Sequence, residues 1–134
     1  MPSINPSREQ LALFTQQVED ARPLLMLNLL LFREHAEYPA DSPHSPCSGR
    51  EAYARYSRIA LNKVRSVGGE VQLLASAHAA LIAPIGEQWD EMLLVRYPDK
   101  AAFLSMLSDS EYQQATAHRS AALLDSRLIA THPR

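Results

Sequence analysis

The sequence has a single cysteine, Cys47, among its 134 residues. An internal disulfide is therefore impossible, which suits a protein of a reducing cytoplasm. The amino-terminal segment has no basic region followed by an apolar stretch, so it does not look like a secretory signal, and we expect a cytoplasmic location. The most apolar run, residues 24–32, is far shorter than the ~20 residues of a membrane-spanning helix.

Charge gives no sign of a polyanionic partner. The 13 Lys and Arg residues are balanced by 15 Asp and Glu residues, for a formal net charge of −2. Nucleic acids and anionic membranes are bound by basic faces, so we expect neither as a partner. Nucleotide binding has no support either, because there is no glycine-rich phosphate loop and no Gly-x-Gly-x-x-Gly after a strand.

The ligands of a metal site are also missing. His35, His44 and Cys47 are the nearest set, but a structural zinc site takes four ligands in short paired spacings. Cys47 as a nucleophile would need a fixed base nearby, and the proline-rich loop around it supplies none. We therefore expect no metal and no cofactor.

What is present suffices for one packed domain over residues 1–134. Hydrophobic residues make up 46% of the chain and charged residues 21%, a balance typical of globular domains. Residues 24–32 follow Pro23 and end at Arg33, and so short and apolar a run predicts a strand buried on both faces. Asn28 lies at its centre and needs a hydrogen-bond partner.

Capping signals place the helices of the first half. Ser7 with Gln10, and Ser48 with Glu51, have capping-box spacing. With apolar residues at helical intervals, they predict helices over 7–19 and 49–67. Repeated prolines and serines predict a loop over 34–48, and loops of that length are often mobile or functional.

The second half predicts a hairpin, an interrupted helix and a last strand. Its elements are strands over 70–82 and 88–97, helical turns from residue 98 to about 123, and a strand over 127–131. In the hairpin, Ile82 opposite Trp89 is the register we expect. Ser108 with Glu111 repeats the capping-box spacing and predicts a break and restart of the helix near 108. Asp125-Ser126 is expected to turn the chain.

This order predicts an α+β, ferredoxin-like βαββαβ core over residues 24–131, with the helix over 7–19 as an addition. The plan is a four-stranded antiparallel sheet with two helices on one face. Because the strands are apolar on both sides and helices cover only one, the other face is predicted to be an association site. The simplest arrangement is a two-fold homodimer with sheets facing each other.

A series of short segments resembles a known family. They are Met26-Leu27-Asn28-Leu29-Leu30, Gly49-Arg50-Glu51-Ala52-Tyr53-Ala54-Arg55-Tyr56, Gly68-Gly69, Trp89-Asp90-Glu91, Arg96-Tyr97-Pro98, Ala102-Phe103, Ser108-Asp109-Ser110-Glu111-Tyr112 and His118-Arg119. Over residues 24–131 the chain resembles the domain-of-unknown-function family thirteen-thirty, of the dimeric α+β barrel superfamily. The resemblance implies a ferredoxin-like protomer and a homodimer whose sheets form a barrel. It implies no reaction, because that superfamily holds cofactor-free monooxygenases, isomerases, haem-degrading enzymes and plain binding proteins.

Two residues are candidates for chemistry on the strands. Asn28 could hold a carbonyl or enolate oxygen as an oxyanion donor, or it could bond a backbone group and fix the strand register. His78, if it lies near Glu91 across the hairpin, would have a raised pKa and could act as a general base. The alternative for His78 is a polar contact at the barrel rim or the dimer interface.

Further candidates lie on the late helix, the hairpin and the long helix. His118 could move a proton, and Arg96 and Arg119 could anchor a carboxylate through bidentate contacts, or they could form structural salt bridges. Trp89 and Tyr53 could line an aromatic pocket, together with Tyr56 and Tyr112, or all four could be core residues.

The sequence therefore favours a small cytoplasmic homodimer that binds a small organic molecule between sheet and helices. If it is an enzyme, we expect cofactor-independent proton transfer or oxygenation. The alternative is a non-catalytic dimeric binding or structural module, with the polar groups satisfied within the fold, and haem binding is a third hypothesis. Catalysis requires the candidate polar groups to converge on one cavity.

Overall fold

The strand at residues 24–32 has the predicted bounds, and the sheet is built around it. The computed structural model describes residues 2–134. Its elements are α1 (Arg8–Gln17), β1 (Leu24–Phe32), α2 (Gly49–Ser66), β2 (Glu70–Ser76), β3 (Glu91–Tyr97), α3 (Lys100–Leu107), α4 (Ser110–Ala122) and β4 (Leu123–Thr131). The strands pair antiparallel in the order β2-β3-β1-β4. This topology confirms the predicted ferredoxin-like α+β fold.

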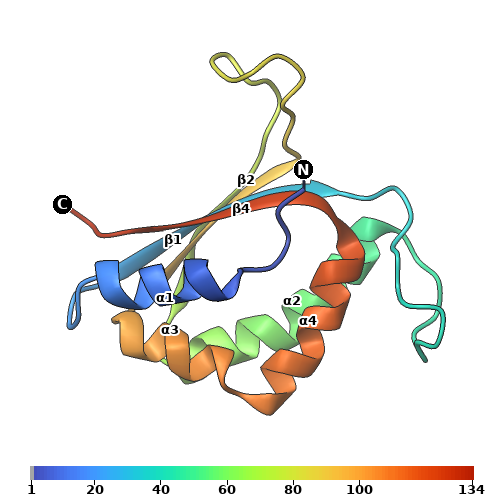
Figure 1. Cartoon of the computed structure of the whole chain (residues 1–134). Helices are drawn as coiled ribbons and strands as arrows, with labels where there is room; N and C mark the ends of the chain where they lie inside the picture. The colour runs from blue at the N-terminus through green and yellow to red at the C-terminus, as the bar shows by residue number, and fades with distance from the viewer. Residues whose placement is uncertain (1) are drawn as a thin grey trace.

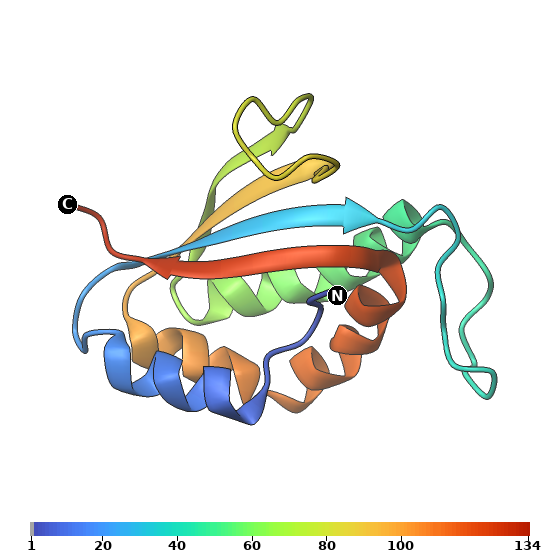
Figure 2. The same ribbon diagram turned by 45° about the horizontal axis from the view of Figure 1, so that its top comes forward.

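The helices lie on one face of the sheet and leave the opposite face open (Figures 1 and 2). Strand β1 alternates accordingly: Leu24, Met26 and Leu30 face the helices and are at most 3% exposed, while the leucines between them stay half-buried. Strand β1 was predicted to be buried on both of its faces, and within the protomer only the face toward the helices is fully buried. Among residues 2–134 every helix is too short or too polar to span a bilayer.

The predicted helix starts are confirmed at the first two sites. Ser7 and Gln10 form a complete capping box at α1, and the Ser48 side chain accepts a hydrogen bond from the backbone of Glu51 at α2. The helix break near residue 108 is also present, but the cap of α4 is Asp109 rather than Ser108. Its carboxylate accepts a hydrogen bond from the Tyr112 amide at 2.9 Å. Its negative charge also interacts favourably with the positive end of the helix dipole.

The loop over 34–48 is closed at its base by backbone contacts. The Gly49 amide donates to the Arg33 carbonyl at 3.1 Å, and His35 forms a bridge with Ser48. A Cβ atom at position 49 would overlap the backbone of Arg33, so only glycine permits this approach. The loop therefore leaves and re-enters the fold at one point.

The predicted hairpin strands were too long, and their register was wrong. Strand β2 ends at Ser76, strand β3 begins at Glu91, and these two residues are partners. The register with Ile82 opposite Trp89 would have put Ser76 opposite Val95 instead. The strands stop because residues 77–90 extend beyond the helices, so their apolar side chains have no core against which to pack.

The last strand was predicted too short. Helix α4 ends at Ala122 and β4 begins at Leu123, so the turn expected at Asp125-Ser126 is part of the strand. Ser126 pairs with Leu30 and is only 3% exposed. Turn-forming residue types were overridden here by pairing along the full length of β1.

Candidate functional site

A cavity of about 930 Å³ lies between the helix side of the sheet and the helices. Strands β1, β3 and β4 form its floor, α2, α3 and α4 form its walls, and α1 with residues 3–6 covers it. Most of its lining surface is apolar, which is typical of sites for small organic ligands, and polar side chains from β1, β4, α1, α2 and α4 are also part of it.

Asn28 lines this cavity from the centre of β1 and is 9% exposed. Its amide nitrogen donates to the carbonyls of Leu93, at 3.2 Å, and of Met26, at 3.4 Å. Both amide hydrogens are thus directed to the backbone, which satisfies the buried group and links β1 to β3. The amide oxygen is the part of Asn28 left for a ligand, and it is an acceptor, not an oxyanion donor.

Arg119 lines the same cavity from α4 and is half-buried. Its guanidinium donates to the Ile4 carbonyl, and it lies 3.5 Å from the Ser126 hydroxyl. Among residues 2–134 no carboxylate pairs with it, whereas Arg50 and Arg127 each have an acidic partner. A guanidinium beside an apolar cavity without a counter-ion favours an anionic ligand.

Three tyrosines, Tyr53, Tyr56 and Tyr112, line the cavity wall. Tyr53 lies on α2, and burial raises its pKa to about 12, although the nearby charge of Arg119 acts in the opposite direction. Tyr56 and Tyr112 bond each other through their hydroxyls at 2.9 Å, and burial raises the pKa of Tyr56 well above its ordinary value. Burial therefore keeps the phenols of Tyr53 and Tyr56 neutral at physiological pH. The Tyr53 hydroxyl can donate a hydrogen bond, whereas the Tyr56–Tyr112 pair uses one of its two hydroxyl hydrogens for its own bond.

His118 lies on a different side of α4 and does not line the cavity. Its Nδ1 lies 2.7 Å from the Tyr38 hydroxyl, and its ring is 4.3 Å from that of His44, so it packs against the long loop. Arg55 donates to the Tyr38 oxygen at 3.2 Å, which leaves the Tyr38 hydroxyl hydrogen for Nδ1. Burial, followed by the charges of His44 and Arg55, lowers the pKa of His118.

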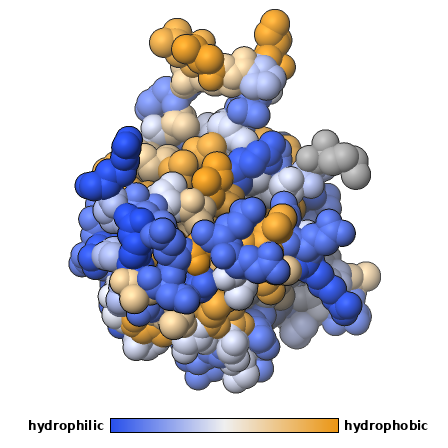
Figure 3. Space-filling model, turned by 60° about the vertical axis from the view of Figure 1, so that its left-hand side comes forward, coloured by the Kyte–Doolittle hydropathy of each residue, from blue (hydrophilic) through white to orange (hydrophobic). Residues whose placement is uncertain are grey.

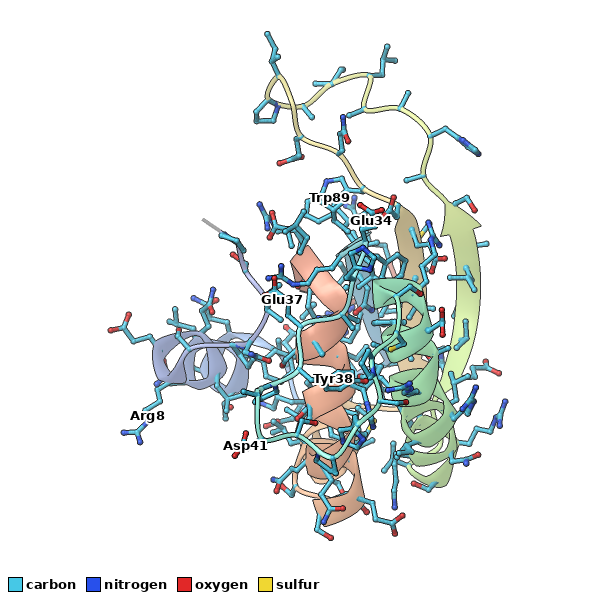
Figure 4. The ribbon with its side chains drawn as sticks, turned by 90° about the vertical axis from the view of Figure 1, so that its right-hand side faces the viewer. Arg8, Glu34, Glu37, Tyr38, Asp41 and Trp89 are labelled. Carbon is cyan, nitrogen blue, oxygen red and sulfur yellow. The ribbon has the colours of Figure 1, made fainter. Side chains whose placement is uncertain are left out.

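The other predicted site residues lie outside the cavity. His78 is in the hairpin connection, beyond the end of β2, and the expected His78–Glu91 pair is absent. Glu91 is opposite Ser76 and binds Arg50 at 3.1 Å. Arg96 is opposite Leu25 on the open face of the sheet. Trp89 is at the base of the hairpin connection (Figure 4), and the guanidinium of Arg127 lies 5.1 Å from the centre of its ring.

The structure adds cavity residues that the sequence reasoning missed, among them a serine and a histidine near the end of the chain. Ser126 and His132 both line the cavity from β4 and its extension. The Nδ1 of His132 bonds the Pro23 carbonyl at 2.9 Å, while its Nε2 is buried with no hydrogen-bond partner among residues 2–134. A strand predicted to continue through residues 123–132 would have placed Ser126 and His132 on its helix-facing side, because every second residue of a strand faces the same way. The turn predicted at Asp125-Ser126 interrupted that pattern.

Similar solved structures exist, although no protein-family model and no curated protein matches the chain. The crystal structure of RPA0582, a protein of unknown function from Rhodopseudomonas palustris, has a TM-score of 0.91 and 36% identity, covering 100% of this chain and 98% of that chain. The structure of methylated RPA0582 gives the same TM-score, 37% identity and coverages of 99% and 96%.

Two more distant structures share the fold alone. SnoaB, a cofactor-independent oxygenase from Streptomyces nogalater, is 13% identical with a TM-score of 0.52, covering 85% of this chain and 95% of that chain. A dimeric ferredoxin-like protein of unknown function from Jannaschia sp. CCS1 is 13% identical with a TM-score of 0.53, covering 83% and 99%. Fold similarity at this level does not carry a reaction across.

Proposed function

We propose that this chain, which belongs to the same family as the Rhodopseudomonas palustris protein RPA0582, binds a small organic acid in the cavity between its sheet and its helices. The ligand has a mainly apolar body and one anionic oxygen group. We also propose, on the motifs over residues 24–131, that this family is part of the domain-of-unknown-function family thirteen-thirty.

The observation that carries this proposal is the position of Arg119. Its guanidinium lies at the cavity without a carboxylate partner among residues 2–134, and it is close enough to Tyr53 to influence the phenol's pKa. A carboxylate seated there would receive charge-assisted hydrogen bonds from Arg119 and a neutral one from Tyr53. The apolar lining would then cover the rest of the molecule.

The geometry favours binding over catalysis. If the protein were an enzyme, the expected cofactor-independent proton transfer or oxygenation would use Asn28 to hold an oxygen and His78 or His118 to move a proton. Neither histidine lines the cavity, and the amide hydrogens of Asn28 are bonded to the backbone. The predicted catalytic groups therefore do not converge, and convergence is what catalysis by them requires.

The binding unit that we propose is a cytoplasmic homodimer formed through the open face of the sheet. Half-buried leucines of β1 cover the centre of that face, and Leu73 of β2 and Ile129 of β4 are 49% and 48% exposed on either side. A face this apolar gains free energy when a second sheet removes it from water.

The experiment uses dansyl-labelled undecanoic acid and its methyl ester as fluorescent probes. The acid should bind at least about tenfold more tightly than the ester, because only the acid can pair with the guanidinium of Arg119. In Arg119→Met the affinity for the acid should fall to that for the ester. Fluorescence titration measures both dissociation constants.

The ester and a second arginine variant serve as controls. Unchanged binding of the ester shows that the cavity of Arg119→Met is intact. Arg58→Met removes an exposed guanidinium on α2 that does not line the cavity, so it should bind both probes as the wild type does. Equal affinities for acid and ester in the wild-type protein would refute the proposed ligand class.

A further inference from the structure

The connection between β2 and β3 forms an arm over residues 77–90 that stands away from the rest of the molecule (Figure 3). The amide of Ala77 donates to the carbonyl of Asp90 at 2.9 Å and closes its base, and the amide of Glu87 donates to the Pro84 carbonyl near its tip. The arm is thus a defined extension of the hairpin with a turn at its end.

The tip of this arm is apolar and fully exposed. Leu81, Ile82 and Ile85 are 96%, 94% and 106% exposed, more than any other large hydrophobic residue among residues 2–134. Loop tips in water are normally polar, because an exposed aliphatic side chain forgoes the gain of burial. Three such side chains on one short arm indicate a contact surface.

The arm and the open face of the sheet lie on the same side of the molecule. Figures 1 and 2 show the arm rising from the sheet on the side away from the helices. A protein that packs against the half-buried leucines of β1 therefore also contacts the side of the arm that faces the sheet. The two apolar surfaces are continuous through Ala75 and Met92, which are opposite each other on the open face beside the arm's base.

We propose that the arm clasps a second copy of this chain, with the tip residues Leu81, Ile82 and Ile85 packed against the partner. This inference rests on the homodimer of the proposed function. Each copy carries one open face and one arm, so a two-fold arrangement covers both faces and both arms at once. A head-to-tail arrangement would leave one face and one arm uncovered at each end. The arm has no Lys or Arg, and its two carboxylates are Glu87 and Asp90, the latter at the base, where it accepts a hydrogen bond from the Phe32 amide, so the fit at the tip is apolar rather than electrostatic.

Sedimentation equilibrium of the full chain tests the arm directly. The wild-type protein should be a dimer at micromolar concentration. The triple variant Leu81→Ser, Ile82→Ser, Ile85→Ser should raise the dimer dissociation constant at least about tenfold, because each dimer loses the burial of six side chains. Since these side chains contact nothing within the protomer, the variant should keep the wild-type circular dichroism spectrum.

A second measurement keeps the test independent of folding effects. In Cys47→Ser with Ile82→Cys, a benzophenone maleimide placed on the arm should yield a covalent dimer on illumination, with the cross-link mapped to a peptide of the other copy. A wild-type dimer with an unchanged dissociation constant in the triple variant and no cross-link would overturn the arm's role and leave the sheet-face dimer standing. A wild-type monomer would overturn both.

Discussion

At the scale of single residues, two neighbours on α4 have opposite surroundings. Arg119 lines the cavity, while His118 packs against Tyr38 and His44 of the long loop. Successive residues of a helix are separated by about 100°, so adjacent side chains belong to different surfaces. The shared motif His118-Arg119 therefore does not form one functional unit.

The environment of His118 predicts that stability depends on pH. Burial lowers its pKa in the folded protein below the ordinary value of 6.5. At a pH between the pKa of His118 in the unfolded chain and its pKa in the folded protein, the unfolded chain binds more protons than the folded protein does. The free energy of unfolding therefore falls as the pH drops below 6.5. It levels off below the folded pKa. Urea unfolding between about pH 8 and pH 5 measures this loss.

Two substitutions separate His118 from other titrating groups. His118→Gln cannot be protonated at this position, so its stability should fall less over the same pH range. Tyr38→Phe loses the hydrogen bond to Nδ1 but keeps the aromatic ring edge-to-face with the imidazole, and it should retain most of the wild-type pH dependence because burial is the main cause of the lowered pKa. An identical pH slope in the wild type and His118→Gln would show that His118 is not responsible.

At the scale of elements, α1 is the least firmly attached helix. None of its residues is buried, and its last turn has no basic side chain to compensate the negative end of the helix dipole. Lys100 of α3 supplies that charge: its ammonium group donates to the carbonyls of Thr15 and Val18 at 2.7 and 2.9 Å and pairs with Asp20. Helix α1 therefore covers the cavity through one main polar anchor.

Removing this anchor should loosen α1 selectively. In Lys100→Met, hydrogen exchange of the α1 amides should accelerate at least about tenfold, while exchange in β1 should change little, because the sheet keeps its own contacts. Lys63→Met is the matched control, since Lys63 pairs with Asp109 and Glu111 at the start of α4. Equal protection of α1 in the wild type and Lys100→Met would contradict the role of this lysine.

At the scale of the whole molecule, the fold leaves one sheet face and one arm without cover within the protomer. If the native state is the homodimer that we propose, folding and association are linked. A hundredfold increase in protein concentration should then raise the apparent stability by about 2.7 kcal/mol, which thermal unfolding at several concentrations measures.

A charge on the open face should abolish this dependence. Leu94→Arg places a guanidinium among the apolar side chains of that face, so its unfolding midpoint should not change with concentration. Ala54→Arg adds the same charge at an exposed position on α2 and should behave like the wild type. A concentration-independent midpoint in the wild-type protein would exclude a linked dimer.

The sequence by itself determined the features that depend on neighbouring residues. The bounds of β1, the capping of α1 and α2, the break before α4 and the order of elements all follow from local hydrogen bonding and hydrophobic periodicity. These interactions join residues a few positions apart, so a single sequence contains them in full.

Only the tertiary structure decided which residues share a site. The ends of β2 and β3, the register of their pairing and the start of β4 depend on where the helices and β1 provide partners. The cavity therefore unites Asn28, Tyr53 and Arg119 from three elements and leaves out His78, His118 and Arg96. Residue type identified all six as candidates, but only packing between distant segments sets which of them meet.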